Sequence, residues 1–444
     1  MLSVEENELL CRVGPGTEMG AFMRQYWVPA LVSTELAEPD CPPVRVKLLG
    51  EELIAFRDTS GQVGLIAANC QHRGASLFFG RNEERGLRCV YHGWKYDVTG
   101  ACVDMPNEPP ESNFKTKIRA MAYACRERGG VVWAYMGPRR EPPPLPDFEA
   151  NMLPEGQWRV TATMRECNYL QALEGDIDTS HSPFLHSGTD RVEDTRPGTF
   201  QYYRVQNRSP RFNVLDTDFG TMYGAHIGAE ADSEYWRIAC YLFPFYTIIP
   251  QGLLGHQVHI RAWVPMDDTH MMFIYMDKRQ EREVRSRGAG VGDESADPRR
   301  TQLAPRTTDW YGRFRLRPNL SNDYFVDREK QQRKLSFSGI EGVAIQDKAA
   351  TESQGLISDR TKEHLVSSDA MIIRTRQRLI QAARAFHEKG LVPPGVDDPD
   401  VYRVRGGGVI LPKDADWLKS TEELRRGFVE HPELDPAIVG LDRG

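Results

Sequence analysis

The chain has 444 residues, enough for two or three domains of ordinary size. A hydrophobic share of 40% and a charged share of 27% are typical of a globular protein with a sizeable core. Lys and Arg number 56 against 63 Asp and Glu, so no basic surplus exists to neutralise nucleic-acid phosphates. No apolar run reaches the roughly 18 residues that a membrane span needs, and the acidic N-terminus lacks signal-peptide features. We therefore expect a cytoplasmic protein that binds neither nucleic acid nor membrane.

The first 137 residues divide by their patterns into a helical segment and a β module. In residues 1–26, Ser3 and Glu6 form a capping-box pattern ahead of an apolar helix face, and we expect this segment to pack with the C-terminal domain. Residues 27–137 hold short alternating or apolar runs between Gly and Asp turns, which predicts a small all-β domain. The Pro-rich stretch 138–148 predicts a stiff, extended linker and the main domain boundary.

Residues 149–444 are expected to form a second, larger domain. A strand is predicted over residues 158–165, and a helix begins near Asn168. Further strand-length runs follow at hairpin spacing and predict an antiparallel sheet. These runs cover residues 200–207, 212–218, 221–227, 235–243, 256–264 and 271–276. The polar stretch 281–305 is predicted as a surface loop, and residues 369–386 have the apolar periodicity of an amphipathic helix. Both domains together predict an α+β fold.

Two Cys and two His in the β module form the first candidate metal site. Cys70 and His72 are followed, after sixteen residues, by Cys89 and His92. Eight cysteines are too few for a disulfide scaffold, so paired Cys and His point to a metal. One interpretation is a structural zinc, and the other is a Rieske [2Fe–2S] cluster, in which two His replace two Cys on one iron. A single residue between Cys and His is unusual for zinc, which favours the cluster.

A second candidate metal site lies beyond the linker, between Asp178 and His186. Asp178 and His181 are three residues apart, so we expect them on one face of a helix. His186 follows after Pro183 has turned the chain. Two His and a carboxylate from elsewhere can form the facial triad of a mononuclear iron(II) oxygenase, with open positions for oxygen and water. This spacing therefore predicts an iron site.

The residues around both sites resemble those of the Rieske non-haem iron oxygenases. His-Arg-Gly at 72–74 and His-Gly-Trp-Lys-Tyr at 92–96 are similar to the cluster-binding loops, and residues 178–186 match the iron motif D-x-x-H-x4-H. The resemblance covers essentially the whole chain. Further segments look like the phthalate 4,5-dioxygenase-type branch of the family. They lie at residues 322–333, 337–340, 346–347, 352–355 and 359–360.

This resemblance implies one Rieske [2Fe–2S] cluster held by all four residues of the first site. Cys70 and Cys89 are implied to bind the inner iron, and His72 and His92 the outer iron. Imidazole ligands are neutral, which raises the reduction potential of such a cluster to roughly −150 to +300 mV. The resemblance thus implies a centre that passes one electron at a time.

The resemblance also implies one mononuclear Fe(II), with His181 and His186 as ligands. Asp347 matches the position of the third ligand in the family. Glu352 is a competitor that spacing alone does not exclude, although it lies five residues on and would face elsewhere on a helix. Asp178 is implied to bridge the iron ligand His181 to His92 of a neighbouring subunit, in a homotrimer or hexamer.

The fold and function follow from the same resemblance. It implies an N-terminal all-β Rieske domain and a helix-grip catalytic domain, in which an antiparallel sheet surrounds helices. A separate reductase with flavin and a ferredoxin-type centre would supply electrons from NADH. The leading hypothesis is a terminal oxygenase that uses O2 for cis-dihydroxylation of a phthalate-like aromatic acid. Monooxygenation or O-demethylation of a methoxy- or aryloxy-aromatic acid is the alternative. A pure electron carrier and a zinc-stabilised binding module are the other classes.

Arginines in the expected sheet are candidates for binding an aromatic carboxylate, because a guanidinium pairs well with that group. These candidates are Arg208, Arg211, Arg237 and Arg261. Apolar and aromatic residues that alternate along the strands are the expected lining of a substrate pocket. They are Phe212, Val214, Tyr223, Phe243 and Phe245.

Overall fold

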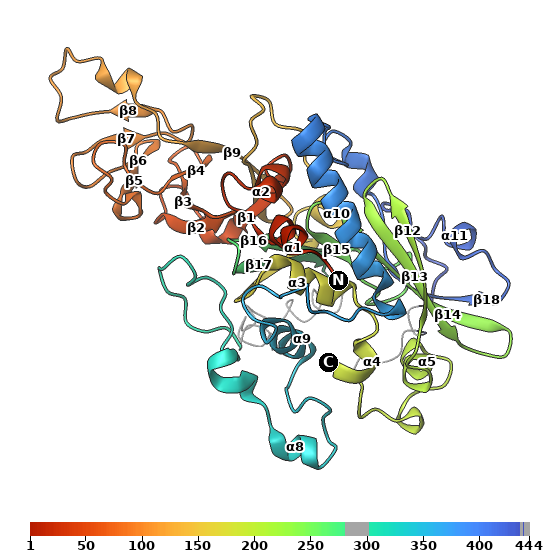
Figure 1. Cartoon of the computed structure of the whole chain (residues 1–444). Helices are drawn as coiled ribbons and strands as arrows, with labels where there is room; N and C mark the ends of the chain where they lie inside the picture. The colour runs from red at the N-terminus through yellow and green to blue at the C-terminus, as the bar shows by residue number, and fades with distance from the viewer. Residues whose placement is uncertain (280–301, 436–437, 439–444) are drawn as a thin grey trace.

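Two β-rich parts of the chain can be followed in the computed structural model, which describes residues 1–279, 302–435 and 438 (Figure 1). The first part narrows toward one end of the molecule and carries strands β1 to β10, and the second holds the larger sheet and most helices. Residues 281–301 of the expected surface loop lie outside the described residues. Among the residues described, no helix combines the length and apolarity that a bilayer crossing needs.

The N-terminal part contains a six-stranded and a four-stranded antiparallel sheet, with orders β1-β10-β9-β4-β3-β2 and β5-β6-β7-β8. The strands of the first sheet are β1 (Trp27–Val32), β2 (Val44–Leu48), β3 (Glu51–Arg57), β4 (Val63–Ala67), β9 (Ala122–Arg128) and β10 (Val131–Tyr135). Those of the second are β5 (Arg81–Glu83), β6 (Gly86–Arg88), β7 (Lys95–Tyr96) and β8 (Cys102–Asp104). The alternation expected of a strand is clear in β2, where Val44, Val46 and Leu48 are buried. The expected all-β domain is confirmed.

The second part is built on an eight-stranded antiparallel sheet. Seven of its strands have the order β11-β17-β16-β15-β14-β13-β12, and the eighth, β18, pairs with β14. Its strands are β11 (Trp158–Arg165), β12 (Arg211–Thr217), β13 (Gly220–Gly228), β14 (Ser233–Leu242), β15 (Tyr246–Ile248), β16 (His259–Pro265), β17 (Met271–Lys278) and β18 (Gly407–Pro412). The expected sheet is confirmed. The patterns missed β15, which is short, and β18, which returns from far along the chain.

Helices α3, α5 and α10 contact this sheet. The helices of the described residues are α1 (Val4–Cys11), α2 (Glu18–Met23), α3 (Tyr169–Ile177), α4 (Ser182–Leu185), α5 (Phe200–Gln206), α8 (Arg328–Gln332), α9 (Val343–Glu352), α10 (Ala370–Lys389) and α11 (Trp417–Ser420). The long helix α10 packs on β12, β13, α1 and α2, and α3 packs on β14, β15 and β16. A sheet that holds helices in this way is the helix-grip arrangement, so the α+β prediction is confirmed. The division at residues 26, 137 and 148 stays a prediction.

Residues 200–207 are helical as α5, and the prediction of a strand there was wrong. The Thr199 hydroxyl accepts a hydrogen bond from the backbone N–H of Tyr202, which caps the helix. Phe200 then stacks on Tyr235 of the sheet, with ring centroids 4.4 Å apart. The aromatic residues of 200–207 favour a strand by their intrinsic propensity. The Thr199 cap and the packing of Phe200 on Tyr235 together stabilise the helix instead.

Candidate functional site

The two Cys–His segments of the first site form turns with the same backbone geometry. The N–H of Cys70 and of Cys89 each donates to the carbonyl five residues later, at 2.8 Å in both turns. Each Cys carbonyl in turn accepts from a glycine four residues later, Gly74 at 2.9 Å and Gly93 at 3.0 Å. Both glycines have positive φ, +72° and +79°, which disfavours any side chain there. Two turns of matched geometry thus carry the two thiols and the two imidazoles.

The imidazoles of the first site are placed for metal binding. The rings of His72 and His92 lie 4.4 Å apart, and Trp94 stacks on His72 at 4.5 Å. Nδ1 of His72 is buried and has no hydrogen-bond partner within the described residues, as a metal-binding nitrogen needs. The Tyr96 hydroxyl lies 3.3 Å from Sγ of Cys70, which is a hydrogen bond to the sulfur of a candidate ligand. These residues fit a [2Fe–2S] cluster.

The second site is assembled from α3, α4 and α9. His181 immediately precedes the short helix α4, and His186 immediately follows it, whereas Asp347 lies on α9. The Nε2 atoms of the two His are 3.0 Å apart, and Oδ1 of Asp347 lies 3.5 Å from the first and 3.0 Å from the second. Ligand atoms about 2.1 Å from a metal ion and at right angles to each other lie about 3.0 Å apart. The three atoms therefore fit one face of an octahedral ion.

Asp178 and His181 do not share a helix face, and that prediction was wrong. Helix α3 ends at Ile177, because the Asp178 carboxylate accepts hydrogen bonds from the N–H and hydroxyl of Ser180, at 2.7 and 2.5 Å. Such local side-chain bonds compete with helix continuation. The pair still meets: Oδ2 of Asp178 lies 3.5 Å from Nδ1 of His181.

Gln346 supports the second imidazole, which the sequence patterns did not indicate. Its Oε1 lies 2.7 Å from Nδ1 of His186, and its Nε2 donates to the carbonyl of Ile340 at 2.9 Å. The second bond orients the amide, so its oxygen accepts a hydrogen bond from Nδ1–H of His186. The proton is thereby held on Nδ1, which leaves the Nε2 lone pair directed at the metal position. One feature of the sequence could have pointed to Gln346. A metal-bound His needs a hydrogen-bond acceptor for its other ring nitrogen, and Gln346 is the neighbour of the candidate ligand Asp347.

Gln346→Ala is expected to weaken iron binding about 10- to 100-fold, since His186 loses the acceptor that sets its tautomer. Gln346→Glu retains an acceptor oxygen and should keep most of the iron. Iron content after dialysis against a graded series of chelator concentrations measures the difference. Equal iron retention in Gln346→Ala and wild type would contradict this role.

Glu352, the competitor for the third ligand position, points into the protein instead. Only 3% of the residue is exposed, and Oε2 pairs with Lys348 Nζ at 2.5 Å. The same carboxylate accepts from the Tyr324 hydroxyl and from the N–H of Glu166, each at 2.7 Å. Glu352 thus holds α9 against its neighbours, while Asp347 on the same helix faces the imidazoles.

The electrostatics of the second site favour a cation. Burial opposes the charged form of His181, but hydrogen bonds to Asp178 and Asp347 raise the pKa of His181 to about 10. Burial also opposes ionisation of the two carboxylates, yet the imidazoles hold the pKa of Asp347 well below its usual range, and His181 and Ser180 lower the pKa of Asp178. Both carboxylates are therefore ionised at neutral pH, and a divalent metal bound by His181 would take the place of the proton on that imidazole.

A cavity of about 640 Å³ opens beside this triad. His181, His186 and Asp347 form part of its wall, residues 175–195 supply much of the rest, and β13, β14 and α5 add further residues. Of the predicted lining residues only Tyr223 reaches it, while Phe243 and Phe245 lie in the hydrophobic core. Phe212 and Val214 pack against that core without lining the cavity. The three candidate metal ligands thus lie in the wall of a cavity that is large enough for a small-molecule substrate.

The candidate arginines are placed very differently. Arg237 and Arg261 both line the cavity, but Arg261 is paired with Asp176. Arg208 lies outside the lining and donates to backbone carbonyls of the loop after α4. Arg211 is exposed at the start of β12. Arg237 is therefore the candidate whose charge is directed into the cavity without a carboxylate partner among the described residues.

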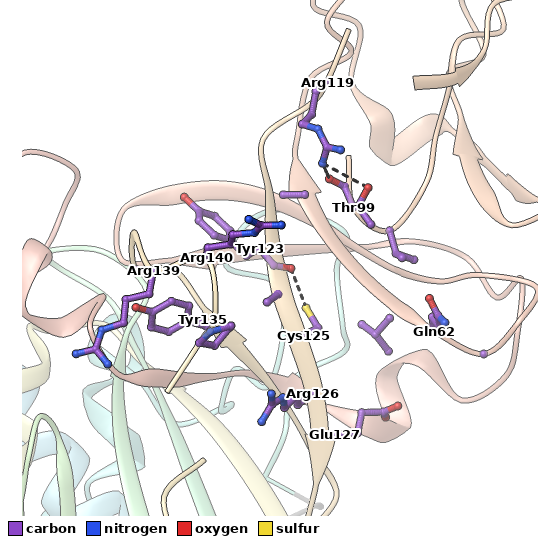
Figure 2. Close-up of a pocket in the computed structure, with 17 residues that line it drawn as sticks. Gln62, Thr99, Arg119, Tyr123, Cys125, Arg126, Glu127, Tyr135, Arg139 and Arg140 are labelled. Carbon is purple, nitrogen blue, oxygen red and sulfur yellow. Dashed lines mark hydrogen bonds between the residues drawn. The ribbon is translucent and has the colours of Figure 1, made fainter. Parts of the chain in front are cut away.

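A second cavity, of about 720 Å³, lies on the N-terminal part between β9 and the linker (Figure 2). Its wall includes Arg119, Arg126, Arg139 and Arg140, and Cys125 is hydrogen-bonded to the Tyr123 carbonyl. None of the ligand residues of either metal site lines it. It is therefore separate from both candidate metal sites.

Comparison with known proteins decides the family. Residues 26–123 match the Rieske [2Fe-2S] domain family, and residues 134–436 match the family described as LigXa C-terminal domain like. The chain is 45% identical over 439 residues to the 3-chlorobenzoate-3,4-dioxygenase oxygenase subunit of Comamonas testosteroni, covering 97% of this chain and 100% of the relative. It belongs to the Rieske non-haem iron oxygenases. Within this family it is an oxygenase (alpha) component.

Two further comparisons agree. The Rieske oxygenase chain is 38% identical over 433 residues to the phthalate 4,5-dioxygenase oxygenase subunit of Pseudomonas putida, with 94% of each chain covered. The crystal structure of dicamba monooxygenase bound to dicamba has the same fold, with a TM-score of 0.56 and 16% identity over 83% of this chain and 100% of that one. The recognition of the family from the two ligand motifs is confirmed.

Membership in this family decides the cofactors and the class of reaction. The protein is an oxidoreductase that uses O2, with one Rieske [2Fe–2S] cluster and one mononuclear iron, and its electrons come from NADH through a separate reductase. The zinc-stabilised binding module is therefore excluded. A pure electron carrier is excluded as well, because the relatives that match nearly the whole chain are oxygenase subunits.

Proposed function

We propose that this oxygenase cis-dihydroxylates an aromatic acid whose carboxylate is bound by Arg237. The single observation that carries the proposal is that one cavity contains both the facial triad and an unneutralised guanidinium. Two relatives support it, since both are named for dioxygenases of aromatic acids, 3-chlorobenzoate and phthalate. The substrate ring would lie between Arg237 and the triad.

Arg237 is held in position by hydroxyl groups, which leaves its charge for a ligand. Its Nε donates to Oγ1 of Thr179 at 2.6 Å, and its Nη1 donates to the Tyr235 hydroxyl at 3.3 Å. Neutral acceptors orient a guanidinium without cancelling its charge, so a substrate carboxylate would form the charge-assisted pair. This arrangement supports selection of an acid over a neutral ring.

We further propose the ligand assignments. Cys70, Cys89, His72 and His92 hold the cluster, and His181, His186 and Asp347 hold the iron. When bound, the cluster supplies single electrons and the iron supplies open positions at which oxygen is activated. The chain itself orients His181 through Asp178 and His186 through Gln346. It also provides the cavity for the ring, to whose wall β13 contributes Tyr223 and β14 contributes Tyr235 and Arg237.

The subunit arrangement proposed for this oxygenase is head to tail, in a trimer or hexamer. Figure 1 places the small sheet β5–β8 and helix α4 on opposite sides of the folded molecule, so the two metal sites of one chain are far apart. Apolar side chains are exposed beside both sites, Val90 and Tyr91 next to His92, and Phe184 on α4. Docking of these surfaces would bring Asp178 to His92 of the partner subunit. Light scattering tests this: a monomer at working concentration would contradict it.

Product analysis tests the reaction. Oxygen uptake is measured with a surrogate reductase and a panel of aromatic acids that includes 3-chlorobenzoate and phthalate. A dihydrodiol that keeps both oxygen atoms supports the proposal, whereas a phenol released with formaldehyde from a methoxy-aromatic acid indicates O-demethylation. Arg237→Gln is expected to lower kcat/KM for acids about 10- to 100-fold, because a charge-assisted hydrogen bond is lost. Arg211→Gln, on the exposed end of β12, is the matched control and should leave kcat/KM unchanged.

A further inference from the structure

Tyr223 and Arg237 come from neighbouring strands and face the same cavity. In the β13–β14 ladder, Tyr223 is opposite Ala239, and Ala225 is opposite Arg237. Residues two apart on a strand share a face, so Tyr223 and Arg237 are diagonal neighbours on the cavity side of the sheet. Both line the cavity beside the iron triad. Any group bound by the guanidinium therefore lies next to this phenol.

The hydroxyl of Tyr223 is buried and has no hydrogen-bond partner within the described part of the chain. Such groups are rare in proteins, because an unpaired buried hydroxyl forfeits its bonds to water. The hydroxyl of Thr179 is close by and accepts from Nε of Arg237 at 2.6 Å, but it is not within hydrogen-bonding geometry of the Tyr223 hydroxyl. Burial raises the pKa of Tyr223, although Arg237 and Thr179 oppose this, so the phenol stays protonated and remains a donor at neutral pH.

We propose that Tyr223 is a specificity-determining residue that donates a hydrogen bond to the acid group of the substrate bound by Arg237. This inference rests on the proposed function and extends it. Arg237 supplies charge, which any anion satisfies, whereas the Tyr223 hydroxyl supplies a fixed donor beside it. A site with buried polar groups rejects analogues that leave those groups unpaired. The pair would thus select an ionised aromatic acid over its isosteric amide.

Binding to the iron-loaded, cluster-loaded enzyme without oxygen tests the proposal, with 3-chlorobenzoate and 3-chlorobenzamide as probes. In Tyr223→Phe the Kd of the acid should rise about 10- to 100-fold, as expected for a lost hydrogen bond to a charged group, and that of the amide should change little. Because the removed hydroxyl has no protein partner, the melting temperature of the unliganded variant should not fall.

Tyr241→Phe is the matched control. Tyr241 is a fully buried tyrosine of β14 that does not line the cavity, and its hydroxyl donates to the carbonyl of Pro244 at 2.9 Å. This variant should melt at a lower temperature and keep the wild-type ratio of acid to amide affinity. An unchanged ratio in Tyr223→Phe would overturn the proposal for Tyr223 alone. A wild-type enzyme that binds neither probe and turns over no aromatic acid would instead overturn the proposed function, and this inference with it.

Discussion

Asp178→Asn is expected to leave both metal centres loaded and to lower substrate-dependent oxygen consumption about 100-fold. Asp178 is not one of the three triad residues, so the iron should stay bound. Its carboxylate, however, lies 3.5 Å from the outer nitrogen of His181 and is held by two bonds from Ser180. An amide of the same size cannot provide two negative oxygens, so it can neither orient that ring in the same way nor stabilise positive charge between two imidazoles. Metal analysis measures the bound iron, and the EPR spectrum of the reduced protein reports on the cluster. An oxygen electrode measures substrate-dependent oxygen consumption.

Asp218→Asn is the matched control for this variant. Asp218 is exposed in the turn between β12 and β13 and does not line the cavity, so full activity is expected. Co-expression of Asp178→Asn with Cys89→Ser adds a test of transfer between subunits. The first variant retains the cluster and the second retains a complete iron site. Two inactive chains should then restore part of the activity in mixed oligomers, and no recovery would indicate transfer within one chain. Full activity of Asp178→Asn alone would refute the bridging role.

Asp347→Ala and Glu352→Ala are expected to have opposite consequences, although the two residues lie on the same helix. Loss of Asp347 removes one of three ligand atoms, so the purified variant should contain cluster iron but almost no mononuclear iron, and turnover should be abolished. Loss of Glu352 leaves the charge of Lys348 buried without its partner. Breaking one side of a buried ion pair costs about 3–5 kcal/mol, so this variant should unfold far more easily.

Metal analysis and denaturant unfolding distinguish the two. After mononuclear iron has been removed from both proteins, Asp347→Ala and the wild type should have nearly the same midpoint denaturant concentration of unfolding. Glu352→Gln, which keeps a hydrogen-bond acceptor for Tyr324, is the milder companion and should retain iron binding where it folds. Loss of mononuclear iron from a folded Glu352→Gln, with iron retained in Asp347→Ala, would reverse the assignment of the third ligand.

Much of the fold was predictable because its patterns are local. The capping box of Ser3 and Glu6 forms as expected, and the alternation in β2 places its apolar residues inward. The helix over residues 369–386 corresponds to α10, which ends where Gly390 adopts a left-handed conformation. The failures have a common physical origin. Residues 200–207 and β18 adopt structures decided by contacts with β14, from which they are separated along the chain.

The site divides in the same way. The amino-acid sequence by itself indicated the candidate ligands that lie within short segments. The matched turns around Cys70 and Cys89, and the short helix between His181 and His186, leave these side chains few arrangements. Only the tertiary structure decided between Asp347 and Glu352 as the carboxylate beside the imidazoles, and which arginine faces the cavity. These choices depend on how α9 and the sheet dock across more than a hundred residues of chain. Buried charge pairs and side-chain packing decide how α9 and the sheet pack against each other. The local periodicity of the sequence contains no information about these long-range contacts.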